Sequence, residues 1–229
     1  MGLFFEGEMR KVVFMIDGWF MWKRVQYLKP FLYDGANIRK YCCRHLRDED
    51  TLYRIFYYDT EPLKKKGHNP VSGKAIDFSQ TSVAKQQNEL LNSIRKTPNM
   101  ALRLGNTVWN KQWVLDFEKL ALLIKGKISV SEISEDDVRP LIRQKSVDMK
   151  IGLDIASIAM KKIADTLIII TGDADIVPAL KMARKEGMHV GLDPLWKNIR
   201  PELSEHVDFI STKFSRPKSY GQTGTKNQS

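Results

Sequence analysis

The stretch of residues 146–193 constrains the fold more than any other part of this chain. Its apolar pattern predicts a helix over residues 147–163, a strand over residues 166–170, a helix over residues 176–186 and a strand over residues 189–192. Gly187 is expected to end the second helix, because glycine is common just after the last helical residue. Alternation of strands and helices in this way predicts a parallel sheet with right-handed crossovers.

The first sixty residues show the same alternation. Residues 11–18 and 52–59 are apolar runs typical of strands, and helices are predicted over residues 19–28 and 34–47, with Asp34 as the cap of the second helix. A last short strand is predicted over residues 207–210. We therefore expect an α/β fold with a central, mostly parallel sheet.

The middle of the chain is less regular. Residues 61–73 hold three consecutive lysines and two prolines and are expected to form a loop, whereas residues 78–96 are typical of an amphipathic helix and residues 100–108 of a strand. Residues 113–124 fit a helix or a strand. For residues 130–135 and 136–144 we favour a strand or turn followed by a short helix.

Several aspartates surround the predicted strand at residues 166–170. Asp173 and Asp175 follow it, Asp148 and Asp154 lie on the helix before it, and Asp17 ends the first strand of the chain. The carboxyl ends of parallel strands meet at one edge of a sheet, so these side chains are expected to approach one another. Carboxylates repel when crowded, and grouping them is costly unless a cation or a bound partner neutralises them.

Each aspartate also has a purely structural explanation. Asp148 could be a helix-terminal acid that stabilises by about 0.3–1 kcal/mol, Asp173 a helix cap, and Asp17 a turn residue. Asp154 is six residues from Asp148, which is about 240° around a helix, so both cannot face one ion. We expect Asp154 to support the site from outside or to pair with Lys150.

Composition narrows the class of protein. The chain has 229 residues, 42% of them hydrophobic, and a formal net charge of +10, which favours a polyanionic partner over the alternative of a merely solubilising surface. The two cysteines are adjacent, so neither a disulfide framework nor a zinc site is expected. No secretory signal or run of about 18 apolar residues is evident, and a reducing cytoplasm is the expected location.

The motifs resemble those of the NYN domain, in the LabA-like branch of the PIN-like nuclease superfamily. The matching pieces are IDG at residues 16–18, KSVDMKIGLD at residues 145–154, TGDADIVPALKMARKEGMHV at residues 171–190 and ELSEHVDFI at residues 202–210. The resemblance implies a PIN-like, three-layer α/β/α fold over residues 9–211 with an insertion at about residues 61–137. It leaves residues 212–229 as a basic tail that we expect to be disordered.

The resemblance also implies a metal-dependent endoribonuclease that uses Mg²⁺ or Mn²⁺ and acts on RNA. It implies catalytic roles for Asp17, Asp148, Asp173 and Asp175, the first three of them as metal ligands. The resemblance is also compatible with a homodimer. Expected RNA contacts are Lys64, Lys65, Lys66, Lys150 and Thr171.

One residue departs from the family pattern. Many members have Asn three residues after the first Asp, and this chain has Phe20 there. A phenyl ring cannot hydrogen-bond to substrate, so the role is absent or another residue, for which Asn37 is a candidate, supplies it. The second function that fits is a non-catalytic RNA-binding or adaptor protein. A haloacid-dehalogenase-type phosphatase is disfavoured, because Trp19 occupies the place of its second aspartate.

Overall fold

The computed structural model describes residues 9–26, 28 and 31–218, and the chain divides into two compact units. The first unit comprises Met1–Asp59, Leu90–Leu104 and Ser146–Ser229, and the second comprises Thr60–Glu89 and Gly105–Lys145. The two units are described separately below. Of the tail predicted over residues 212–229, residues 219–229 lie outside the described residues.

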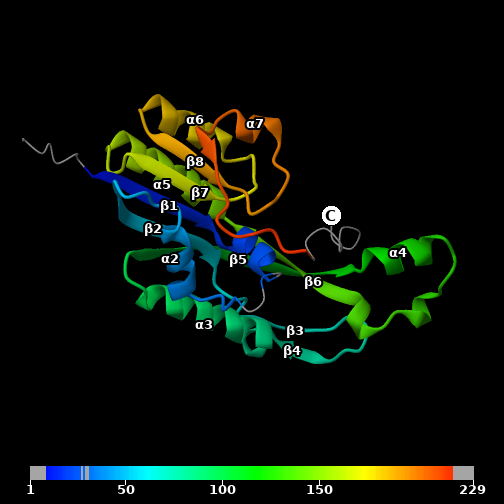
Figure 1. Ribbon diagram of the computed structural model, residues 1–229. Coiled ribbons are helices and arrows are strands. Elements are labelled where there is room, and N and C mark those ends of the chain that lie inside the picture. Colours follow the sequence, from blue (N-terminus) through cyan, green and yellow to red (C-terminus); the bar gives the residue numbers. More distant parts are fainter. Residues whose placement is uncertain (1–8, 27, 29–30, 219–229) are drawn as a thin grey trace, which may run out of the picture. The chain divides into compact units, whose positions relative to one another are not determined.

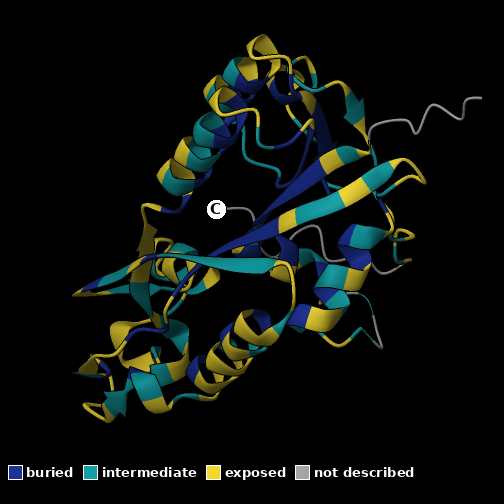
Figure 2. Cartoon of the chain, turned by 90° about the vertical axis from the view of Figure 1, so that its left-hand side faces the viewer, coloured by how far each residue is buried: buried dark blue, intermediate teal, exposed yellow. Residues whose placement is uncertain are grey.

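A parallel sheet forms the centre of the first unit (Figure 1). β1 (Arg10–Asp17) lies between β2 (Asp50–Thr60) and β7 (Thr166–Ile170), and β8 (His189–Asp193) and β9 (Phe209–Ile210) follow β7. Every residue of β7 is buried, as expected for a parallel strand that is covered on both faces, and the buried strands are visible at the centre of Figure 2. The expected parallel sheet is confirmed.

Helices cover both faces of this sheet, which gives the three layers of an α/β/α fold. On one face, α5 (Val147–Met160) and α6 (Val177–Lys185) pack against side chains such as Leu167 and Ile169. On the other face, α1 (Gly18–Val25) and α2 (Gly35–Cys43) pack against Ile168 and Ile170. Successive residues of β7 thus enter opposite cores, because side chains alternate across a strand. The short helix α7 (Pro201–Ser204) was not expected.

The helix boundaries follow the expected local chemistry. The Asp34 carboxylate accepts a hydrogen bond from the Asn37 amide at 2.8 Å and caps α2. Gly187 follows α6 with φ +88°, a conformation that glycine adopts without strain. Both expectations are confirmed, although α2 ends at Cys43, earlier than predicted.

The second unit is built on an antiparallel pair. The later part of β5 (Met100–Leu115) pairs with β6 (Val138–Lys145), and β3 (Lys66–His68) pairs with β4 (Ala75–Asp77). Its small core consists of Leu63, Phe78 and Trp109, with Ile76 and Trp113 packed against them. The remaining elements are the first part of α3 (Ser82–Lys96), α4 (Phe117–Ile124) and three 3₁₀ turns at Phe78–Gln80, Val130–Glu132 and Glu135–Asp137.

Two expectations for this unit are wrong. Residues 61–73 are not entirely loop, because Gly67 pairs with Ile76 and its missing side chain leaves room for Trp109, whose ring lies 2.3 Å from where a Cβ would be. The segment after residue 137 is strand β6 and not a helix. Its Pro140 is tolerated because β6, within the described residues, pairs on one side only. Residues 113–124, left open, contain both strand and helix.

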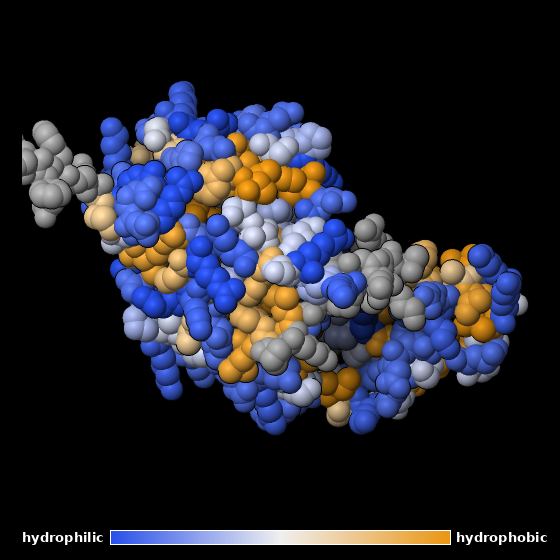
Figure 3. Space-filling view, in the orientation of Figure 1, coloured by the Kyte–Doolittle hydropathy of each residue, from blue (hydrophilic) through white to orange (hydrophobic). Residues whose placement is uncertain are grey.

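The surface seen in Figure 3 is mostly hydrophilic, with apolar side chains gathered in small patches. Of the helices described, none combines the length and the apolar character needed to cross a bilayer.

Candidate functional site

The carboxyl ends of β1 and β7 bring Asp17 close to the segment that carries Asp173. The two strands are parallel, with Ile16 opposite Ile170, so Asp17 and Thr171 leave the sheet side by side. The Thr171 hydroxyl lies 3.5 Å from a carboxylate oxygen of Asp17 and accepts a hydrogen bond from the Asp173 amide at 3.2 Å. Thr171 is buried, and it links the two aspartate segments.

Asp148 approaches the same place from the first turn of α5. Burial raises the pKa of Asp17 to about 6, the amide hydrogen bond from Phe20 lowers it, and the negative charges of Asp148 and Asp173 raise it further. The pKa of Asp148 is raised by burial first and by the charges of Asp173 and Asp175 next. The predicted aspartates therefore share one electrostatic environment.

The chemistry of these donors suits a hard divalent cation, because Mg²⁺ and Mn²⁺ prefer carboxylate oxygens. Burial and neighbouring carboxylates raise the pKa values of Asp17 and Asp148, which disfavours their charged forms unless a cation is bound. Among residues 9–26, 28 and 31–218, however, no three His, Cys, Asp or Glu side chains are placed to hold one metal ion together. The donor types therefore fit the cation, but the carboxylates of the described residues do not converge on one point.

Asp173 and Asp175 differ in their surroundings. The Asp173 carboxylate accepts a hydrogen bond from the Asp175 amide at 3.0 Å, so Asp173 stabilises the turn that precedes α6. Asp175 is exposed. One of the two residues thus has a structural role in the turn, while both contribute charge to the raised pKa of Asp148.

Asp154 makes different contacts from those expected. Its carboxylate accepts hydrogen bonds from the Tyr58 hydroxyl at 2.8 Å and from Arg103 Nε at 3.0 Å. Of the two alternatives expected for Asp154, the pairing with Lys150 is not found, because the Lys150 ammonium donates to the backbone carbonyl of Leu104 at 2.7 Å. Support of the site from outside stays a prediction. Asp154 binds α5 to the sheet and is satisfied without a metal ion.

The three consecutive lysines belong to the second unit and have partners of their own. Lys64 pairs with Glu61 at 2.6 Å, Lys65 donates to the Trp109 carbonyl at 3.1 Å, and Lys66 lies 3.8 Å from Asp77. All three are exposed, so their ammonium groups stay accessible to a polyanion.

Phe20 uses its backbone and not its ring at the acidic site. The Phe20 amide donates a hydrogen bond to the Asp17 carboxylate at 3.0 Å, and through this bond Asp17 caps α1. The buried Phe20 ring packs beside Gly172. A Cβ at Gly172 would lie 2.7 Å from the ring and 2.4 Å from Lys197 Cδ. Asn37 donates its side-chain amide to Asp34 at 3.1 Å and so serves the cap of α2.

Lys197 is a cationic neighbour of the site that the sequence did not indicate. Its ammonium donates to the Gly172 carbonyl at 2.8 Å, between Thr171 and Asp173 in the chain. Leu195 and Trp196 precede it with φ values of +43° and +65°, a strained turn for residues other than glycine. Such a turn has no reliable sequence signal, because nothing in these residue types favours it.

A buried polar cluster holds this turn. Asp193, fully buried, accepts hydrogen bonds from the Tyr41 hydroxyl, from the Leu195 amide at 3.0 Å and from the Thr212 hydroxyl at 2.6 Å. His45 Nε2 lies 3.2 Å from the same carboxylate. Thr212 belongs to the predicted tail, so the packed part of the chain extends into it.

Two tyrosines pack behind Asp17. The Tyr57 ring lies 2.6 Å from where a Cβ of Gly18 would be, so only glycine fits after Asp17. The Tyr33 and Tyr57 hydroxyls are 2.9 Å apart, and burial is the main cause of their raised pKa values. Asp59, at the end of the strand predicted over residues 52–59, is buried and raises both pKa values further by its charge.

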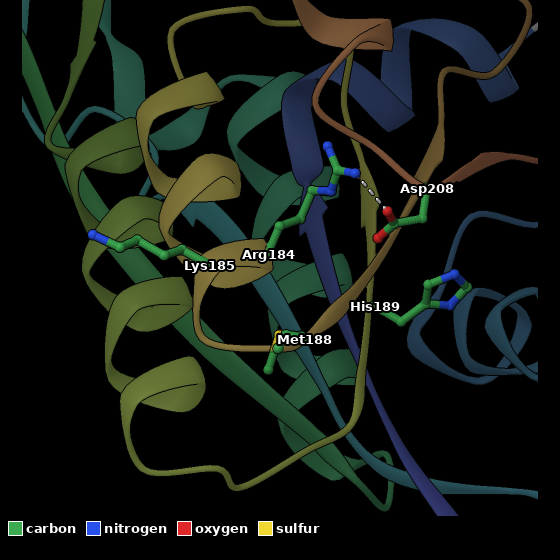
Figure 4. Close-up of a pocket in the computed structure, with 6 residues that line it drawn as sticks. Arg184, Lys185, Met188, His189 and Asp208 are labelled. Carbon is green, nitrogen blue, oxygen red and sulfur yellow. Dashed lines mark ion pairs between the residues drawn. The ribbon is translucent and has the colours of Figure 1, made fainter.

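A separate depression of about 460 Å³ lies beside the start of β8 and is lined by Arg184, Lys185, Gly187, Met188, His189 and Asp208 (Figure 4). Arg184 and Asp208 form an ion pair across it at 2.9 Å. The depression adjoins the beginning of β8, whereas Asp17 and Asp173 follow the carboxyl ends of β1 and β7. The carboxylate in its lining, Asp208, also accepts a hydrogen bond from the Val190 amide. This depression is not the acidic site.

Comparisons with known proteins agree with this description. The chain is 20% identical over 143 residues to an uncharacterized protein from Methanocaldococcus jannaschii, covering 54% of this chain and 60% of that relative's length. A crystal structure of a protein of unknown function from Vibrio parahaemolyticus has a TM-score of 0.50 at 12% identity and covers 92% of this chain and 97% of its own, which shows the fold alone. The NYN domain profile matches residues 73–211, a range that includes Asp148, Asp173 and Asp175. The chain belongs to the NYN domain family.

Proposed function

We propose that this protein is a divalent-metal-dependent ribonuclease, of the LabA-like branch, that hydrolyses RNA phosphodiester bonds at the acidic site. The family is a PIN-like nuclease family, which supports a nuclease-like, RNA-related function. The metal, the RNA substrate, endonucleolytic cleavage, action in the cytoplasm and a homodimeric form are parts of this proposal.

One observation carries the proposal. Burial first, and then the charges of Asp148 and Asp173, raise the pKa of Asp17 to about 6, and these three carboxylates come from two strand ends and one helix start. Folding thus brings three negatively charged carboxylates together, and these three groups cannot neutralise one another. Such an arrangement destabilises the protein, and it is therefore typical of a site whose function needs concentrated negative charge.

Asp17, Asp148 and Asp173 would hold Mg²⁺ or Mn²⁺, with Asp175 adding charge nearby. When bound, the ion supplies charge neutralisation at the phosphate and activation of water. The residues of the chain position these groups: the Phe20 amide holds Asp17, and Thr171 holds the start of the Asp173 turn. Lys197, fixed on the Gly172 carbonyl, adds a positive charge that can bind a phosphate oxygen.

The test is cleavage of a panel of RNA and DNA oligonucleotides with Mn²⁺, with Mg²⁺ and with excess EDTA. We expect RNA cleavage by the wild type only with metal, and a loss of at least about a hundredfold in Asp173→Asn and in Asp17→Asn, with folding intact. Asp48→Asn is the matched control, because Asp48 is an exposed carboxylate that precedes the start of β2, at the end of the sheet opposite to the site. Equal activity in EDTA, or full activity in both site variants, would contradict the proposal.

A non-catalytic RNA-binding or adaptor protein is the second candidate. It is favoured by the loose placement of the carboxylates, of which no three in the described part of the chain converge on one point, and by Phe20 at the usual Asn position. In that case the same panel would give metal-independent RNA binding and no cleavage under any condition.

A further inference from the structure

The solvent-facing side of α1 carries two tryptophans. Trp19 and Trp22, together called the indole pair, are 48% and 40% exposed, whereas Phe20, Met21 and Val25 on the other side of the helix are buried. Tryptophan is usually well buried, because its large ring gains much from leaving water. Two exposed indoles on one short helix therefore suggest a surface that is covered in the working protein.

The two rings are arranged as a stack. Their centroids are 5.3 Å apart and their planes differ by only 13°, the geometry expected for side chains three residues apart on a helix. Stacking covers one face of each ring, so only the two outer faces are left for a ligand, and the Lys23 ammonium lies over the Trp19 ring. Nucleic acid bases stack on such faces irrespective of sequence, because every base has a π face.

Lys23 accompanies the indole pair, with its ammonium 4.7 Å from the centroid of the Trp19 ring. A second cation of α1, Arg24, lies 5.2 Å from the centroid of the Phe20 ring on the buried side of the helix. Lys197 reaches the same Phe20 ring, at 6.0 Å, from the turn after β8. A base on an indole and its phosphate on Lys23 would thus be bound by adjacent side chains, and this combination favours RNA over an apolar protein segment.

The position of α1 links this surface to the acidic site. Asp17 is the N-cap of α1, so Trp19 is only two residues from a carboxylate of the proposed catalytic group. We propose that the indole pair is a stacking surface that binds the bases of single-stranded RNA beside the acidic site; this inference rests on the proposed ribonuclease function. A duplex keeps its bases stacked inside and cannot use the surface, so the substrate class is single-stranded.

The test measures binding apart from cleavage. Fluorescence anisotropy in EDTA, on an Asp173→Asn background, compares three labelled ligands: a single-stranded oligouridylate of about 12 nucleotides, an abasic oligonucleotide of the same length and a blunt RNA duplex. The double variant Trp19→Ala/Trp22→Ala is expected to weaken binding of the oligouridylate about tenfold to a hundredfold. Binding of the abasic strand and of the duplex is expected to change less than about twofold, because only phosphate contacts remain there.

Three controls define the outcome. Trp19→Phe and Trp22→Phe retain an aromatic ring and are expected to keep most of the affinity, which separates stacking from a folding defect. Phe117→Ala removes a 71% exposed aromatic ring from α4 in the second unit and should have no effect. Unchanged oligouridylate binding in the double variant, or an equal loss for all three ligands, would overturn the inference, and unchanged binding would point to another partner for this surface.

The two proposals fail in different ways. If the wild type cleaves no RNA but the double variant selectively loses single-strand binding, the nuclease proposal fails and the stacking surface stands. If metal-dependent cleavage is found and the double variant binds and cleaves like the wild type, the stacking surface alone fails.

Discussion

Asp17 combines two roles that oppose each other. Its carboxylate caps α1 through the Phe20 amide, a role that Asn fills equally well, and its charge is disfavoured by burial and by Asp148 and Asp173. Stability therefore does not require the charge, whereas the proposed metal site does. At such a residue, a substitution that stabilises the fold is expected to abolish function.

The pH dependence of folding follows from this raised pKa. The folded pKa of about 6 lies above the ordinary value of 3.8, so the contribution of Asp17 to stability is fully present below about pH 4 and is lost as the pH rises through 6. In EDTA, Asp17→Asn is expected to be more stable than the wild type, by about 1 kcal/mol more at pH 7.5 than at pH 5 after allowance for partial exposure. Urea unfolding at the two pH values measures this difference.

Mg²⁺ provides the matching control. Adding it should raise the unfolding midpoint of the wild type at pH 7.5 more than at pH 5, and should have little effect on Asp17→Asn. An Asp17→Asn variant that is less stable than the wild type at pH 7.5 in EDTA would show that the charge is compensated.

The sequence predicts the residues of the site unevenly. Asp17 and Asp173 follow apolar strands, and that pattern suffices to place them at one sheet edge. Lys197 and Tyr33 could not be predicted, because their positions depend on a strained turn and on a hydroxyl contact with Tyr57 across 24 residues of sequence. Contacts of this kind depend on the completed fold and leave no local pattern.

Helix α5 connects the site to the rest of the fold, and its glycine offers a test at the scale of the element. Gly152 lies in the interior of α5, and a Cβ there would have Ala179 Cβ as its nearest neighbour at 3.9 Å, an ordinary contact. Gly152→Ala is expected to stabilise the protein by about 0.5–1 kcal/mol, because alanine loses less backbone entropy in a helix. The free energy of unfolding in urea is the measurement.

Gly191 in β8 is the opposite case. A Cβ there would lie 2.2 Å from the Phe209 ring of the neighbouring strand, so Gly191→Ala is expected to destabilise by about 1–3 kcal/mol. If both alanine variants changed stability in the same direction, the packing described for these two elements would be wrong.

Elements with strong periodicity were predictable and isolated short ones were not. The apolar runs and Gly187 predict the strand and helix pattern of residues 147–193 almost to the ends of its elements. Strand β3 has three residues and depends on pairing with β4, and β6 contains a proline that argues against a strand. Both are formed by partners distant in sequence, which local propensity does not reveal.

At the scale of the whole molecule, charge is the main property that bears on RNA binding. The net charge of +10 coexists with a cluster of aspartates in the first unit, so positive charge elsewhere must supply attraction for a polyanion. Lys64, Lys65 and Lys66 are the densest run of positive charge in the described residues, and they are exposed.

RNA binding by the whole protein is therefore expected to depend strongly on salt. Each phosphate contact releases counterions, so the slope of log K against log salt concentration for single-stranded RNA should be about −2 or steeper. The variant Lys64→Ala/Lys65→Ala/Lys66→Ala should make the slope shallower by roughly 0.7 for each lysine that binds phosphate. An unchanged slope would remove these lysines from the RNA interface, since their existing partners Glu61, the Trp109 carbonyl and Asp77 would then account for them fully. Affinity that stays constant from low to high salt would contradict the role given to the net charge itself.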